Sequence, residues 1–112
     1  MDIDELINKL YYSLNELVSK GDINITTIKF SNELLETLKI IENCTGCKKD
    51  NIKENYFDEI HKLINEIKPE KGEESDDIIY KLNEELIRID VELNKKVLCE
   101  GCKEKKSRKI NH

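Results

Sequence analysis

The sequence predicts an all-α protein: a small antiparallel up-down bundle of about four helices, with a four-cysteine zinc site at one end. Three observations predict it. Apolar residues recur at steps of three and four in four segments of the chain. Glycine or the single proline separates these segments, and a Cys-x-Gly-Cys motif follows the second and the fourth. A length of 112 residues suits one domain with one modest core.

The first segment carries the clearest helical pattern. Asp2 and Glu5 stand three residues apart, which is the spacing of a capping box at a helix start. Gly21 is expected to end the helix, because glycine readily adopts the backbone conformation that follows many helices. The apolar stripe of this helix consists of Ile3, Leu6, Ile7, Leu10, Tyr11, Leu14, Leu17 and Val18.

The start of the second helix is ambiguous. Residues 23–30 are rich in β-branched side chains, which suit an extended segment as well as the first turns of a helix. We expect the helix to begin at about Thr27, with Ser31 as the alternative N-cap. Its apolar stripe, formed by Leu34, Leu35, Leu38 and Ile41, stops at Asn43.

Pro69 divides the second half of the chain into two helices, because proline breaks the helical hydrogen-bonding pattern. The third helix is expected to begin at Asp50, a good N-cap, and the fourth at Ser75, where acidic residues follow in the first turn. The third stripe is Ile52, Tyr56, Ile60, Leu63, Ile64 and Ile67, and the fourth is Ile78, Ile79, Leu82, Leu86, Ile89, Leu93 and Val97.

Short connections make consecutive helices antiparallel neighbours. The link between the second and third helices and the end of the fourth helix then lie at the same end of the bundle. All four cysteines occupy these two places. We therefore expect a bundle over residues 1–102, followed by a flexible basic tail over residues 103–112.

The cysteines form two copies of one motif. Cys44 and Cys47 belong to the first copy, Cys99 and Cys102 to the second, and a lysine follows each copy. A tetrahedral zinc ion is commonly held by four thiolates, and two Cys-x-x-Cys turns supply them. The glycine inside each motif is expected to ease the turn of the backbone. The segment between the motifs is longer than in a compact zinc ribbon, so the bundle itself must bring them together. The sequence predicts one structural zinc ion per chain.

Other uses of the cysteines stay open. Iron or an iron–sulfur cluster, disulfides or redox-active dithiols, and thiols without a ligand all fit the same motif. Zinc is favoured because the chain has no signal-peptide pattern or membrane-spanning apolar run, which indicates the cytoplasm, where disulfides are rare. Four thiolates leave no open position for a catalytic water, and His61 and His112 stand away from the motifs.

Charge is distributed unevenly along the chain, which carries −5 in total. Residues 94–112 contain seven basic and two acidic side chains, whereas residues 1–93 are strongly acidic. Lysines near a zinc site can contact phosphates, or can simply offset the negative charge of four thiolates. The candidate nucleic-acid or phosphate contacts are Lys48, Lys49, Lys103, Lys105, Lys106, Arg108 and Lys109.

Several apolar residues lie outside the four stripes. These are Tyr12, Phe30, Phe57, Ile87, Val91 and Leu98. Surplus apolar surface on a small acidic bundle indicates a protein partner or a second copy of the chain. We take Phe30 and Phe57 as the candidate partner-binding residues.

The sequence contains no phosphate-binding loop, nucleophile motif or open metal site. We therefore expect a non-enzymatic, regulatory zinc-binding module that binds a protein and has no small-molecule substrate or membrane contact. A redox or iron–sulfur protein is the enzymatic alternative. A second alternative is a nucleic-acid-binding or transcription-associated factor that uses the lysine-rich zinc end and the tail.

Overall fold

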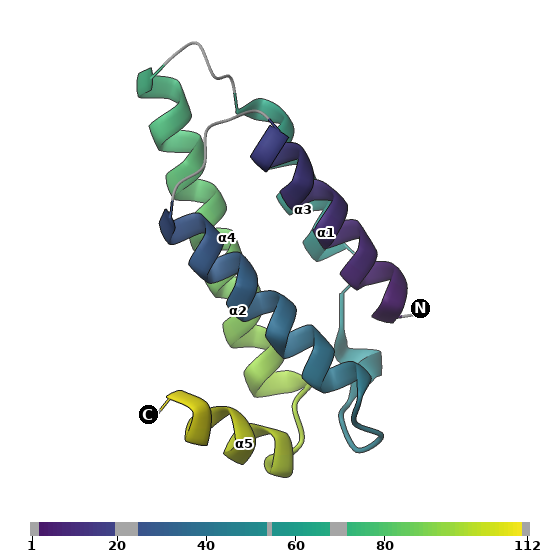
Figure 1. Cartoon of the computed structure of the whole chain (residues 1–112). Coiled ribbons are helices and arrows are strands. Elements are labelled where there is room, and N and C mark those ends of the chain that lie inside the picture. Colours follow the sequence, from purple (N-terminus) through teal and green to yellow (C-terminus); the bar gives the residue numbers. More distant parts are fainter. Residues whose placement is uncertain (1–2, 20–24, 54, 68–71, 111–112) are drawn as a thin grey trace.

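The computed structural model describes residues 3–19, 25–53, 55–67 and 72–110, and its regular elements are all helical (Figure 1). They are α1 (Ile3–Ser19), α2 (Ile25–Glu42), the 3₁₀ turn η1 (Lys49–Asn51), α3 (Asn55–Glu66), α4 (Gly72–Lys96) and α5 (Glu100–Ile110). The predicted all-α bundle is confirmed, with α5 as an additional short helix. Within the described residues, none of the helices has the length and apolar character needed to cross a membrane.

The four long helices contact one another in a closed cycle. α1 packs against α2 and α3, and α4 packs against the same two helices. The link from α2 to α3 and the turn from α4 to α5 lie at the same end of the molecule, and α5 lies across that end (Figure 1). This arrangement is the one that brings the two cysteine motifs together.

The core is formed by the predicted stripes. Leu10, Leu34, Leu38 and Leu86 are fully buried where the helices face one another. Two residues of the first stripe differ: Tyr11 and Val18 are about half exposed, because they stand at the edge of α1 beside α2. The buried face of α1 is therefore narrower than the stripe of apolar residues predicted from the sequence.

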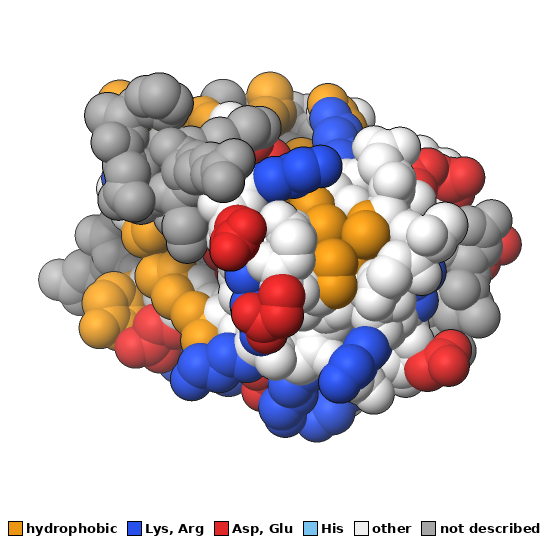
Figure 2. Space-filling view, turned by 90° about the horizontal axis from the view of Figure 1, so that it is seen from below, with side chains coloured by type: hydrophobic (Ala, Val, Ile, Leu, Met, Phe, Trp, Pro, Cys, Tyr) orange, Lys and Arg blue, Asp and Glu red, His pale blue; other side chains and the backbone are white. Residues whose placement is uncertain are grey.

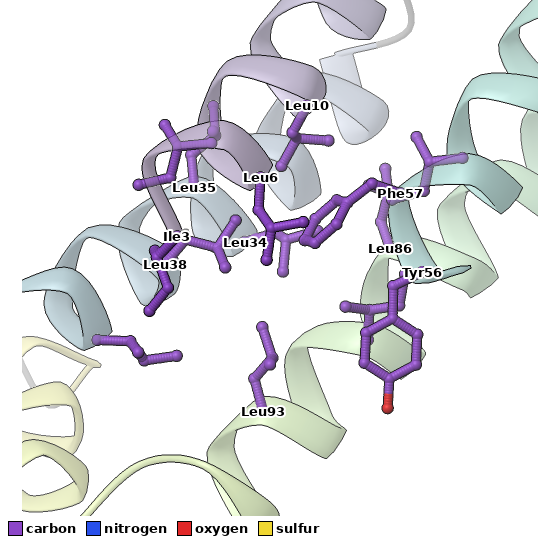
Figure 3. Packing of buried hydrophobic residues seen from close by; sticks show 14 of the residues in the cluster. Ile3, Leu6, Leu10, Leu34, Leu35, Leu38, Tyr56, Phe57, Leu86 and Leu93 are labelled. Atoms are coloured by element: carbon purple, nitrogen blue, oxygen red, sulfur yellow. The ribbon is translucent and has the colours of Figure 1, made fainter. Parts of the chain in front are cut away.

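Phe57 is a core residue, so its prediction as part of a partner-binding surface is wrong. Only 2% of the side chain is exposed, and Figure 3 shows its ring directed into the core toward Leu6. The neighbouring Tyr56 is also buried, so α3 turns two consecutive aromatic side chains inward. Leu98 is buried as well, whereas Phe30 is half-buried and packs against the core.

The contact between α2 and α4 also contains buried polar groups. The Thr27 hydroxyl donates to the Asn83 side chain at 2.6 Å, and the Thr37 hydroxyl donates to Asp90, also at 2.6 Å. These bonds satisfy hydroxyls that would otherwise be costly to bury. The β-branched residues at the start of α2 are helical from Ile25 onward, which resolves the ambiguity of residues 25–30; residues 23 and 24 lie outside the described part.

The third helix begins later than predicted. We expected it from Asp50, but η1 and an extended Ile52 come first, and α3 starts at Asn55. The Lys48 amide donates to the Val97 carbonyl at 2.8 Å, and the Asn51 side chain donates to the Lys96 carbonyl at 2.8 Å. This segment therefore bonds to the end of α4, which caps the last carbonyls of that helix.

Residues 103–110, which we expected to be a flexible tail, belong to α5. Lys106 anchors this helix to the bundle: its amine lies 3.0 and 3.2 Å from the two carboxylate oxygens of Asp90 and also donates to the Thr37 hydroxyl. The side chains of Lys106 and Asp90 are only 15% and 17% exposed. The ion pair joins α5 to both α2 and α4.

Candidate metal centre

The four predicted ligands meet at one end of the bundle. Cys44 and Cys47 lie in the link after α2, Cys99 directly precedes α5, and Cys102 lies in its first turn. Their four sulfur atoms lie within 4.8 Å of one another, although 55 residues separate the members of each close pair. The fold therefore performs the long-range closure that the sequence spacing requires.

The sulfur separations fit a single ion. Cys44 Sγ lies 3.6 Å from Cys99 Sγ, and Cys47 Sγ lies 3.7 Å from Cys102 Sγ. A regular tetrahedron with metal–sulfur bonds of about 2.3 Å has sulfur–sulfur edges of about 3.8 Å. All four cysteines are free thiols in the structure. The donor set is thus a four-cysteine cluster able to hold one metal ion.

Backbone hydrogen bonds hold the two motifs in place. The Lys48 amide, directly after Cys47, bonds to the Val97 carbonyl, two residues before Cys99. At the end of α4, the amides of Val97 and Leu98 both donate to the Leu93 carbonyl at 3.0 Å, which stops the helix and turns the chain toward Cys99. The sulfurs are therefore positioned by the bundle and not by the motifs alone.

The two glycines of the motifs have ordinary backbone conformations. Neither Gly46 nor Gly101 adopts the left-handed conformation that favours glycine, contrary to the role we expected for them. A methyl group at Gly46 would stand 3.8 Å from the sulfurs of Cys44 and Cys99. Gly101 lies in the first turn of α5, with open space where a side chain would project.

The thiols differ in their acidity. A hydrogen bond from the Gly46 backbone amide, with smaller contributions from the other three cysteines, lowers the pKa of Cys44 to about 6. Burial raises the pKa of Cys47 and that of Cys102. Cys47 and Cys102 therefore favour the protonated thiol unless a cation compensates the negative charge of their thiolates. A bound metal ion supplies this charge, and its binding would release the protons.

One side of the cluster is open to solvent. Cys44 and Cys102 line a groove of about 600 Å³ that also contains Lys39 and Lys105. Cys44 and Cys99 are partly exposed, whereas Cys47 and Cys102 are buried. The cluster is therefore accessible from solvent on the side of Cys44 and Cys99.

The predicted basic contacts differ in their surroundings. Lys48, Lys49 and Lys105 are exposed near the sulfurs, whereas Lys106 is occupied by its ion pair with Asp90. Lys103 is half-buried and lies 3.6 Å from the Glu100 carboxylate. Arg108 and Lys109 have side chains outside the described part. At this end both kinds of charge are exposed: basic side chains gather along the lower edge of the view, and acidic side chains lie left of its centre (Figure 2).

Sequence reasoning missed the polar network beneath the cluster. Thr37, Asp90 and Lys106 join three helices beside Cys102, and Asn51 fixes the end of α4. One signal was present in the sequence: Asn83 and Asp90 are seven residues apart, so they share a face of the fourth helix. That face meets the two buried threonines of α2.

Comparison of the chain with protein-family models, curated proteins and solved structures gives no match.

Proposed function

We propose that the protein is a non-enzymatic, zinc-stabilised helical module that binds a protein partner in a regulatory role. One observation carries the proposal: four cysteine sulfurs from distant parts of the chain lie within 4.8 Å of one another. An ion at their centre would join the link between α2 and α3 to the junction of α4 and α5. The helical surfaces would then keep a fixed relative position for recognition.

Zinc suits this cluster better than an iron–sulfur centre. In an iron–sulfur cluster the four cysteines are divided between two or four iron atoms, so some of their sulfurs lie farther apart than the ligands of one ion. Here all four sulfurs lie within 4.8 Å of one another. Separations of 3.6 and 3.7 Å match the edges expected for one tetrahedral ion. Mononuclear iron would accept the same ligands but would colour the protein, whereas zinc is colourless.

A structural role is favoured over a catalytic one. Four thiolates fill a tetrahedral coordination shell and leave no position for substrate or water. The described histidine, His61, lies on α3, where its Nδ1 atom is 3.0 Å from the Ser13 hydroxyl of α1. An interaction role is supported by large apolar side chains that stay exposed, among them Tyr11, Val18 and Ile28.

Metal analysis combined with thermal unfolding tests the zinc assignment. We expect one zinc ion per chain, and we expect both Cys47→Ser and Cys102→Ser to lose the ion. Structural zinc contributes on the order of 10 kcal/mol at neutral pH, so both variants should melt far below the parent. Thr45→Ser, an exposed change inside the same motif, is the matched control. A parent without metal, or a Cys47→Ser variant that melts with the parent, would refute the proposal.

Nucleic-acid binding is the second candidate function. It is favoured by the three exposed lysines beside the cluster, Lys48, Lys49 and Lys105. Replacement of Lys48 and Lys49 by glutamate should then abolish salt-sensitive retention on heparin or DNA. This pair tests the idea better than a deletion of residues 103–112, because the deletion also removes the structural Lys106.

A further inference from the structure

An apolar groove of about 130 Å³ follows the seam between α1 and α2. The two helices lie side by side on one face of the molecule (Figure 1). The groove is lined on α1 by Tyr11, Leu14 and Val18 and on α2 by Ile28, Asn32 and Leu35. On each helix these residues recur at helical spacing, so they form two parallel stripes rather than scattered side chains.

The rims of this groove are exposed. The exposed fractions are 48% for Tyr11, 51% for Val18 and 40% for Ile28. Ile25, one turn before Ile28 on the same helix, is 84% exposed. A group of exposed apolar side chains along one groove is typical of a surface that is covered in a complex.

The described lining of the groove contains no charged side chain. Asp, Glu, Lys and Arg make up 38% of the chain, yet none of those that the structure describes lines this seam. Each of three larger grooves on the molecule is lined by charged side chains. These are Lys9 and Asp58 in one groove, Asp90 and Lys95 in another, and Glu36 and Lys105 in the third. A basic or acidic partner would find no complementary charge at the seam, so a neutral apolar surface fits it best.

A second copy of the chain meets this requirement. The polar groups at the seam include the Tyr11 hydroxyl and the amides of Asn15 and Asn32, and each of these carries both a donor and an acceptor. Such groups can pair with themselves across a two-fold axis, where both partners present the same surface. Each copy carries −5, so two copies repel one another least at a surface such as this one, whose described lining contributes no charge.

We propose that the seam between α1 and α2 is the interface of a symmetric dimer, in which two copies pack these stripes against each other. This inference rests on the proposed interaction role, because it specifies the partner as a second copy. It does not depend on the metal, because the seam contains none of the cysteines.

Sedimentation equilibrium of the metal-loaded full chain tests the dimer, over concentrations from about 1 µM to 1 mM. We expect the mass to double with concentration, and Val18→Glu and Ile28→Glu to weaken association at least about tenfold, because each buries an unpaired charge. Val91→Glu is the matched control: Val91 is 44% exposed but lines a different groove, so this variant should dimerise like the parent. Added salt should strengthen the dimer by screening the repulsion between the copies.

Mixing variants tests whether the two faces meet. The double variant Val18→Glu/Ile28→Glu and the double variant Val18→Lys/Ile28→Lys should each be monomeric alone and should associate when mixed. Helix content and metal content must match the parent; Val18→Thr, a change of similar shape, is the milder variant if they do not.

A metal-loaded chain that stays monomeric at about 1 mM would overturn the dimer and leave the zinc assignment intact. A dimer that tolerates Val18→Glu and Ile28→Glu, or double variants that do not associate when mixed, would overturn it as well. A parent chain without metal would instead refute the proposed zinc role.

Discussion

Tyr56 on α3 is a buried side chain whose hydroxyl donates to the Glu92 carboxylate on α4. Arg88 lies 5.8 Å from the centre of the Tyr56 ring and contacts Glu85 and Glu92 through its guanidinium. Burial, and then the neighbouring carboxylate, raise the pKa of Tyr56 to about 12. The folded protein therefore holds the proton of this hydroxyl more tightly than the unfolded chain does.

We predict that Tyr56 contributes to a loss of stability in alkaline solution. Its stabilising effect is complete below about pH 10, where the unfolded residue keeps its proton, and declines as the pH rises to about 12. Tyr56→Phe should therefore be less stable than the parent at neutral pH, and the difference should shrink across this window. Denaturant unfolding of both proteins at several pH values measures it. A difference that stays constant or grows with pH would contradict the prediction.

At the scale of single residues, the metal ligands could be predicted and their surroundings could not. The repeated spacing of Cys44, Cys47, Cys99 and Cys102 indicates a shared ligand set before any fold is known. The pairing of Thr37 with Asp90 and Lys106 depends on how three helices are rotated about their axes. A polar residue next to an apolar stripe does not indicate that rotation, so its partner cannot be predicted from the sequence. The prediction for Phe57 fails for a related reason. The buried face of α3 is wider than the predicted apolar stripe and includes Phe57.

At the scale of elements, α5 is held to the bundle mainly by polar interactions. Among its residues with described side chains, Cys102 alone is buried, and Lys106 supplies the ion pair with Asp90. A helix with so little apolar surface has little tendency to dock through the hydrophobic effect. The four-cysteine cluster and the ion pair are therefore the main contacts that hold it.

We predict that Asp90→Ala destabilises the protein by about 1–3 kcal/mol, because the amine of Lys106 loses its carboxylate partner in a mostly buried place. The Thr37 hydroxyl can still donate to the Glu33 carbonyl at 3.0 Å, so the loss is concentrated on Lys106. The control is Asp58→Ala. Asp58 lies 3.5 Å from Lys9, but both side chains are more than half exposed, so its removal should cost less than about 0.5 kcal/mol. Urea unfolding compares the two variants. Equal effects would show that the pair beside α5 has no special role.

The boundaries of the elements were the least predictable part of the fold. Asp50 has the features of an N-cap, but the bonds from Lys48 and Asn51 to the end of α4 compete with helix formation there. The helix at Glu100–Ile110 has a polar sequence with no core stripe, so periodicity gave no reason to expect it. In both cases contacts with distant residues decide the local structure.

At the scale of the whole molecule, the topology followed from connection lengths and apolar periodicity. Four long helices joined by short links place the α2–α3 link beside the end of α4, and the sulfurs confirm this placement. The same reasoning could not identify the seam between α1 and α2. Tyr11 and Val18 have the spacing of core residues, and only the packing of the helices shows that they stay exposed.

The four sulfurs come in two pairs from separate halves of the chain. A chain break between Ile67 and Gly72 would leave α1 to α3 with Cys44 and Cys47 on one peptide, and α4 and α5 with Cys99 and Cys102 on the other. Neither peptide alone would possess a complete coordination shell. We predict fragment complementation: peptides 1–67 and 72–112 should associate and bind one zinc ion per pair. Their affinity for each other should be at least about 100-fold higher with zinc than in the presence of a chelator. Titration calorimetry measures the affinity, and Cys102→Ser in the shorter peptide should remove the effect of zinc.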